Sequence, residues 1–204
     1  MKKQKLLTDV LSNIVSRMSF PIEYRAMTYT DTTVTLFGLC DIGHIQPNKI
    51  VTINGLNYTV LSYGEDIVNY KVTLKKSASQ AAPPESGTFY LYTPHFFHGT
   101  PIQQETELSH IKNQQLKTPM IYLMEPYTSK IDNSWESSIY SRSKVTICFL
   151  AEADIHKLKT DDLQYTAVKP MFNLCQDFIA KLIEARMFYT DELTYDITYH
   201  SKFG

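Results

Sequence analysis

Residues 139–200 constrain the fold more than any other stretch, because their apolar pattern passes from a strand period to a helix period and back. Apolar and polar side chains alternate from residue 139 to residue 149, as in a half-buried strand. Residues 171–183 then carry one apolar stripe at helical spacing, and residues 193–199 alternate again. Two one-sided strands and a one-sided helix can cover one another only as a sheet with a helix across it.

The N-terminal segment predicts a second flanking helix. Residues 4–18 place apolar side chains three and four positions apart, and Pro21 is expected to end this helix. Its single apolar stripe must dock on a part of the chain that is distant in sequence. Residues 119–124 are apolar on both faces and predict a central strand of the sheet.

Two further segments complete the expected second half. Residues 127–138 are mostly polar, contain the single tryptophan, Trp135, and are predicted to form a loop. Thr160, followed by Asp161 and Asp162, is expected to begin the C-terminal helical region, in which Pro170 would separate a short helix from the long one.

The middle of the chain predicts short strands joined by turns. Asn54 and Gly55 stand between two β-rich runs and predict a tight type I′ hairpin. Residues 77–87 are expected to form a projecting loop. The predicted strands are residues 32–39, 49–53, 56–63, 67–75 and 88–92.

A short helix is predicted after this β-rich region. Thr100 is a capping residue, Pro101 suits the first helical position, and Gln103 occupies the capping-box position. The helix would run to about residue 114.

The predicted fold class is therefore α+β. An antiparallel sheet is packed by N-terminal and C-terminal helices, and a small β-barrel or β-sandwich-like subdomain is inserted. Residues 1–20 and 118–204 would form the α+β core. Residues 21–117 would form the insertion, with its short helix near residues 101–114.

Composition excludes some classes of protein. A formal net charge of -1 over 204 residues argues against a protein that works mainly by neutralising nucleic-acid phosphates. No apolar run of signal-peptide or membrane-span length follows the basic first residues, so we expect no membrane partner, and synthesis in the cytoplasm. The 3 cysteines form no close pair and suggest no disulfide framework or zinc knuckle.

No catalytic or metal motif is recognisable. His95 and His98 are three residues apart around two phenylalanines, whereas a helical metalloprotease motif has histidines four apart with a glutamate between them. Flanking Pro94 and Gly99 predict an aromatic turn there. Glycine-rich phosphate loops and Gly-x-Ser-x-Gly elbows are absent from the sequence, so we predict no enzyme, no catalytic or metal residue and no cofactor.

The residues around the long strand offer candidates for contacts with other subunits. Arg142, Lys144 and Lys130 can form a basic strip, for which a solvated strand face competes with an acidic partner or nearby DNA. Trp135 either folds back on the core or anchors a neighbouring subunit. The predicted oligomer-interface residues are Tyr127, Lys130, Trp135, Tyr140, Arg142 and Lys144.

The order of helix, strand beginning at Pro119, long strand over residues 143–149, helix and final strand over residues 193–199 resembles a known family. It is similar to the tail terminator and related neck proteins of tailed bacteriophages, of the minor tail protein U type. The resemblance covers about residues 4–18 and 119–200, and rests on residue class rather than on an invariant motif. Residues 21–118 replace what is a short connection in the family.

This resemblance implies a structural virion protein at the head-to-tail interface. Such proteins form homo-oligomeric rings that join the tail to the head, with a hexamer favoured here and a dodecamer as the alternative. The implied partners are further copies of the chain and the adjoining neck and tail proteins, and packaged DNA can pass nearby. A different reading of the sequence is a non-enzymatic ligand- or peptide-binding module that uses the β-rich segment.

Overall fold

The computed structural model describes residues 7–66, 69–111, 118–135, 138–151 and 167–186. These residues form a mixed α+β fold that consists mostly of strands, which confirms the predicted class. In chain order the elements are α1 (Leu7–Ser16), β1 (Pro21–Tyr24), β2 (Ala26–Tyr29), β3 (Thr33–Leu39), β4 (Ile50–Ile53), β5 (Leu56–Asp66), β6 (Asn69–Lys75), β7 (Gly87–Tyr90), β8 (His95–Gly99), α2 (Pro101–His110), β9 (Met120–Trp135), β10 (Ser138–Leu150) and α5 (Lys169–Glu184).

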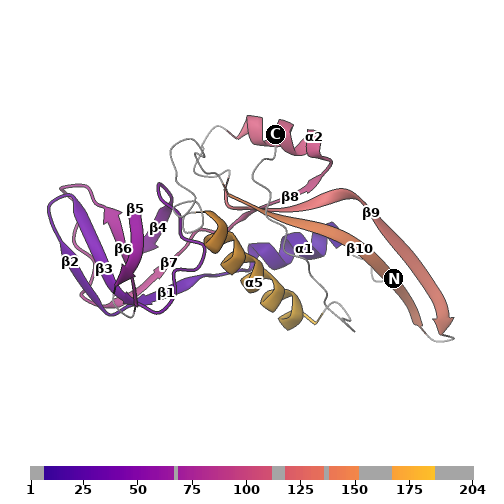
Figure 1. Ribbon diagram of the computed structural model, residues 1–204, viewed down its shortest axis with the longest axis horizontal. Helices are drawn as coiled ribbons and strands as arrows, with labels where there is room; N and C mark the ends of the chain where they lie inside the picture. The colour runs from indigo at the N-terminus through magenta and orange to yellow at the C-terminus, as the bar shows by residue number, and fades with distance from the viewer. Residues whose placement is uncertain (1–6, 67–68, 112–117, 136–137, 152–166, 187–204) are drawn as a thin grey trace.

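Seven antiparallel strands form a curled sheet in the order β1-β7-β4-β5-β6-β3-β2 (Figure 1). β1 and β2 stand at opposite ends of this order, although only Arg25 separates them in the chain. The Arg25 N–H donates to the Phe37 carbonyl oxygen at 2.9 Å, so the chain passes directly from one end of the sheet to the other. Fully buried apolar side chains of this sheet include Val34, Leu36, Val51, Val60, Val72, Leu74 and Phe89.

The predicted Asn54-Gly55 hairpin is confirmed. Asn54 has φ 48° and Gly55 has φ 78°, the positive values that a type I′ turn requires. The turn joins β4 to β5, and Ile53 pairs with Leu56 across it. The five strands predicted from residue 32 to residue 92 correspond to β3, β4, β5, β6 and β7, with ends that differ by a few residues.

Residues 21–29 were not predicted to be strands, and this was wrong. α1 ends at Ser16, and Pro21 begins β1, where it pairs with Tyr90 of β7. Proline has no backbone N–H, but it is tolerated at the first position of a strand. Pro21 can therefore follow the helix and still begin a strand.

The loop predicted over residues 77–87 does not project freely. The Tyr24 hydroxyl donates to the Pro84 carbonyl oxygen at 3.0 Å, and the Tyr58 hydroxyl donates to that of Ala81 at 3.1 Å. Pro83 is buried. These contacts hold the loop against the curled sheet, because two tyrosines on strands of the sheet donate hydrogen bonds to carbonyl oxygens of the loop.

The predicted capping box of α2 is confirmed, although the helix ends at His110. The Thr100 N–H donates to Gln103 Oε1 at 2.8 Å, and the Gln103 N–H donates to Thr100 Oγ1 at 3.4 Å. Residues 112–114 of the expected helix lie outside the described residues.

A second sheet has three strands in the order β10-β9-β8. β9 lies between its two neighbours, as the doubly apolar residues 119–124 predicted, and Met120, Ile121, Tyr122 and Leu123 are fully buried. β10 is antiparallel to β9, whereas β8 is parallel to it, pairing His95 with Met120 and Gly99 with Met124.

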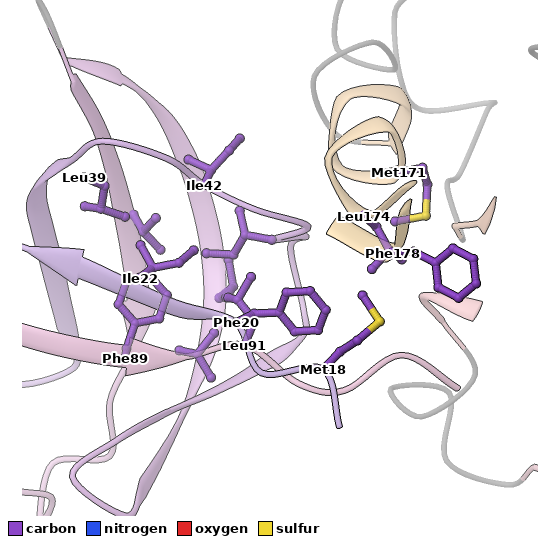
Figure 2. Close-up of a cluster of buried hydrophobic side chains, with 14 of the residues drawn as sticks. Met18, Phe20, Ile22, Leu39, Ile42, Phe89, Leu91, Met171, Leu174 and Phe178 are labelled. Atoms are coloured by element: carbon purple, nitrogen blue, oxygen red, sulfur yellow. The ribbon is translucent and has the colours of Figure 1, made fainter. Parts of the chain in front are cut away.

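α1 and α5 lie between the two sheets and join them through one continuous core (Figures 1 and 2). The predicted stripe of α1 is confirmed, since Val10, Leu11, Ile14 and Val15 are buried. The stripe of α5 is confirmed at Met171, Leu174 and Phe178, whereas Ile183 at its end is 56% exposed. Figure 2 shows Met18 and Phe20 between the curled sheet and α5, whereas the Phe178 ring points away from the curled sheet. That ring packs against Phe149 of β10.

Pro170 lies in the first turn of α5. The short helix expected before it, with Thr160, Asp161 and Asp162, and the strand expected over residues 193–199 lie outside the described residues.

Candidate assembly surfaces: a β-arm and an acidic pocket

The long hairpin of β9 and β10 extends away from the body of the molecule (Figure 1). β8 pairs with β9 only as far as Met124. Beyond that point β9 pairs with β10 alone among the described residues. We call this two-stranded part, residues 125–135 and 138–145, the β-arm. At about 3.3 Å per residue, its β9 strand spans roughly 35 Å.

The β-arm leaves the body at an irregularity in the ladder. Lys144 pairs with Thr128, but Thr146 pairs with Met124, so Val145 stands opposite a longer stretch of β9. That stretch contains Pro126, which has no N–H to donate to a ladder. Such irregularities bend strands, and this one coincides with the end of β8.

The predicted loop over residues 127–138 is therefore wrong: β9 runs to Trp135 and β10 begins at Ser138. Polar residues dominate the segment and gave no alternating apolar pattern. Its extended form comes from pairing with β10, which a local pattern cannot report.

All six predicted interface residues lie on the β-arm. Tyr127, Lys130 and Trp135 belong to β9, whereas Tyr140, Arg142 and Lys144 belong to β10. The fold brings the basic residues together in register, since Arg142 pairs with Lys130 and Lys144 lies two residues along from Arg142. The Lys144 side chain is exposed.

The register gives this part of the arm a basic excess. Like charges at directly paired positions destabilise a ladder. Asp132, which pairs with Tyr140, is the one acidic residue at the paired positions 128–132 and 140–144.

A pocket of about 180 Å³ lies between the start of the curled sheet and α5. One wall comes from Met18, Phe20, Ile22 and Leu91. Figure 2 shows Met18 and Phe20 on the side of the curled sheet that faces α5. The complete lining is Met18, Ser19, Phe20, Pro21, Ile22, Asp41, Gly43, Leu91, Asp177, Ala180 and Lys181. We call it the acidic pocket, after Asp41 and Asp177.

The two carboxyl groups differ in their surroundings. Asp41 Oδ1 accepts from the N–H groups of Ile42 at 2.6 Å and Gly43 at 3.0 Å. Burial, and then the charge of Asp41, raise the pKa of Asp177, whereas Lys181 lowers it. Lys181 Nζ lies 2.7 Å from Glu184 Oε2 and is shared with that carboxylate.

The backbone beside the acidic pocket is held in place. Gly43 has φ 53°, and a Cβ built on it would lie 2.9 Å from Leu91 Cδ1. Asn173 Nδ2 of α5 donates to the Gly43 carbonyl oxygen at 2.8 Å. The pocket therefore has a defined shape because helix and sheet are tied directly beside it.

His44 follows Gly43 and is completely buried beside the contact between α5 and the curled sheet. Its Nε2 lies 2.9 Å from the Tyr92 carbonyl oxygen, which fixes Nε2 as the protonated nitrogen of the neutral ring. Nδ1 has no hydrogen-bond partner among the described residues. The rings of Phe20 and Tyr92 pack edge-on, and burial lowers the His44 pKa to about 4, although the Tyr92 backbone opposes this shift.

His95 and His98 lie in β8, so the aromatic turn predicted for them is wrong. Pairing with β9 makes this segment a strand despite the flanking Pro94 and Gly99. Residues three apart in a strand point to opposite faces, and His98 Nδ1 lies 3.0 Å from Glu125 Oε1. Among the described residues, no three His, Cys, Asp or Glu side chains gather as a set of metal ligands.

The sequence contained no signal for the acidic pocket, because Asp41 and Asp177 are far apart in the chain. No helix in the part of the chain that the structure describes is long and apolar enough to span a membrane. No protein-family model, curated protein or solved structure matches the chain.

Proposed function

We propose that this protein is a structural component of a bacteriophage virion that forms a ring at the head-to-tail interface and joins the tail to the head. The observation that carries the proposal is the β-arm, in the setting of α1 and α5 packed on a three-stranded sheet. α1, β9, β10 and α5 follow one another in the chain as do the first four elements of the order for which the sequence resembles tail terminator and neck proteins. The final strand of that order lies outside the described residues, and β8 comes from residues 21–117.

The β-arm supports assembly because an isolated two-stranded hairpin needs a further covering surface to be stable. Two strands without a third strand or a covering helix are marginally stable in water. Beyond Met124 no third described strand pairs with the β-arm, and a neighbouring subunit would cover its exposed edges. Tyr127, Lys130, Trp135, Tyr140, Arg142 and Lys144 are the residues proposed to make this contact.

In this proposal the contact joins unlike surfaces, the β-arm of one subunit and the body of the next. A heterologous contact repeated around an axis closes into a ring. In this proposal residues 1–20 and 118–204 form the ring-building core. The curled sheet within residues 21–117 is an inserted barrel-like subdomain that reaches an adjoining neck or tail protein, and the ring acts without catalysis or a cofactor.

Electron microscopy of virions and mass photometry of the concentrated protein test this function. A ring is expected in both, with a hexamer favoured over a dodecamer. A virion whose head-to-tail interface lacks density for this chain would refute the proposal, since terminator-like rings can need their neighbours in order to assemble in solution.

A shortened arm provides the matched variant. Ser129 and Ser143 are directly paired, so Asn-Gly can replace residues 130–142 as a two-residue hairpin turn. We expect a folded protein that forms no ring. The control is Tyr29→Ala, which removes a 63% exposed aromatic side chain from the curled sheet and should leave assembly unchanged. A full ring from the shortened protein would show that the β-arm is not the contact.

A further inference from the structure

We infer that the β-arm of one subunit docks its Arg142 in the acidic pocket of the next subunit. This inference rests on the proposed ring and names the surface that receives the β-arm. The occupant is therefore a second copy of this chain.

The acidic pocket suits a long cationic side chain. Met18, Phe20 and Leu91 offer an apolar wall for an aliphatic stem, and two carboxylates offer acceptors for its charged end. Arginine fits this combination best, because its planar guanidinium can bind carboxylates through two parallel hydrogen bonds.

The carboxylates have capacity for an incoming cation. The Asp177 carboxylate accepts no hydrogen bond within the part of the chain that the structure describes. Lys181, the nearest cation of the lining, is already shared with Glu184 at 2.7 Å. Asp41 uses Oδ1 for two backbone N–H groups, which leaves Oδ2 as an acceptor.

The β-arm has the complementary charge. Arg142 pairs with Lys130, and Lys144 is exposed two residues away, so the arm concentrates positive charge close to the body of the molecule. Insertion of Arg142 between the two carboxylates would place its positive charge against both of them. The same contact would neutralise the carboxylates of the acidic pocket.

Arm and pocket are separate surfaces of one molecule, as a heterologous contact requires. The β-arm extends from the three-stranded sheet, whereas the acidic pocket opens between β1 and α5. Each subunit can therefore give an arm to one neighbour and receive an arm from the other.

Charge reversal with rescue tests the docking. Asp177→Lys and Arg142→Glu should each weaken assembly by about 30-fold or more, the usual effect of breaking a close interfacial charge pair. The double variant, Asp177→Lys with Arg142→Glu, should recover most of the loss because it restores an opposite pair. The readout is the concentration at which rings dissociate, measured by mass photometry.

Two controls make the same charge changes elsewhere. Glu85→Lys alters an exposed acid of the loop before β7, and Lys71→Glu alters an exposed base on β6. Both should assemble as the unaltered protein does. Thermal unfolding of every variant separates lost docking from lost folding.

Salt provides a second measurement on the unaltered chain. The screening length falls from about 10 Å to about 3 Å between 0.1 M and 1 M ionic strength. The concentration at which rings dissociate should rise over this range. The double variant should show the same dependence on ionic strength.

The outcomes distinguish the docking from the ring itself. Rings of unaltered stability in Asp177→Lys and Arg142→Glu would overturn the docking and leave the proposed function standing. Loss in both single variants without recovery in the double variant would also overturn it. A virion without the ring would refute the proposed function, whereas a dimer that shows the rescue pattern would support arm docking and reject the ring.

Discussion

The buried imidazole of His44 makes stability depend on pH at the junction between the two sheets. The ring is neutral in the fold, with a pKa of about 4, against an ordinary value of about 6.5 in the unfolded chain. The unfolded state therefore binds a proton first as the pH falls. The contribution of His44 to stability is complete above about pH 6.5 and is lost as the pH falls toward 4.

The magnitude follows from the difference between the two pKa values. Each unit corresponds to about 1.4 kcal/mol, so the complete shift is worth about 3 kcal/mol. About 2 kcal/mol of this should be lost by pH 5, where the folded ring is still mostly neutral. The cause is structural. Protonation would add a proton at Nδ1, which has no hydrogen-bond partner in the described part of the chain, and would place a charge between the rings of Phe20 and Tyr92.

The assay is urea unfolding at several pH values, with linear extrapolation to water. His44→Gln keeps an amide donor near the Tyr92 carbonyl oxygen but cannot titrate. It should flatten the loss of stability between about pH 7 and 5, whatever its effect at neutral pH. His110→Gln removes an exposed imidazole at the end of α2 and should keep the original slope. Equal slopes for His44→Gln and the unaltered protein would refute the reasoning.

Two further substitutions test the packing around the acidic pocket. Phe178→Ala removes a buried ring that meets Phe149 edge-on at 5.7 Å; it should cost about 3–5 kcal/mol in urea unfolding, and a cost below about 1 kcal/mol would contradict the shared core. Gly43→Ala forces a side chain into a left-handed backbone and within 2.9 Å of Leu91, so we expect a loss of about 1–3 kcal/mol in the same assay. Gly64→Ala is its control, because no heavy atom lies within 4 Å of the added Cβ, and a similar loss in both variants would contradict the strain at Gly43.

The predicted elements that the structure confirms depend on local chemistry. The stripes of α1 and α5 repeat within one helical turn, and the Asn54-Gly55 turn needs only two residues that accept positive φ. Residues 120–123 are apolar on both faces, and this already indicated a strand covered on both sides. Each of these signals lies within a few neighbouring residues.

The errors fall where pairing with distant residues decides the conformation. His95 to Gly99 form a strand because β9 accepts them as a parallel neighbour, and residues 127–135 are extended because β10 pairs with them. β1 and β2 close a curled sheet through partners in β7 and β3. Strand propensity depends on such partners more than helix propensity does, so these segments carried weak local signals.

The sequence by itself determined the α+β class, both helical stripes, the central strand and the residues that the β-arm carries. Only the tertiary structure decided that Tyr127, Lys130, Trp135, Tyr140, Arg142 and Lys144 share one projecting hairpin, and that Asp41 and Asp177 meet at one pocket. The physical reason is the distance along the chain over which each kind of interaction acts. Periodicity and turn chemistry act between neighbours along the chain, whereas an arm and a pocket are made by strand pairing and core packing between segments that the sequence keeps far apart.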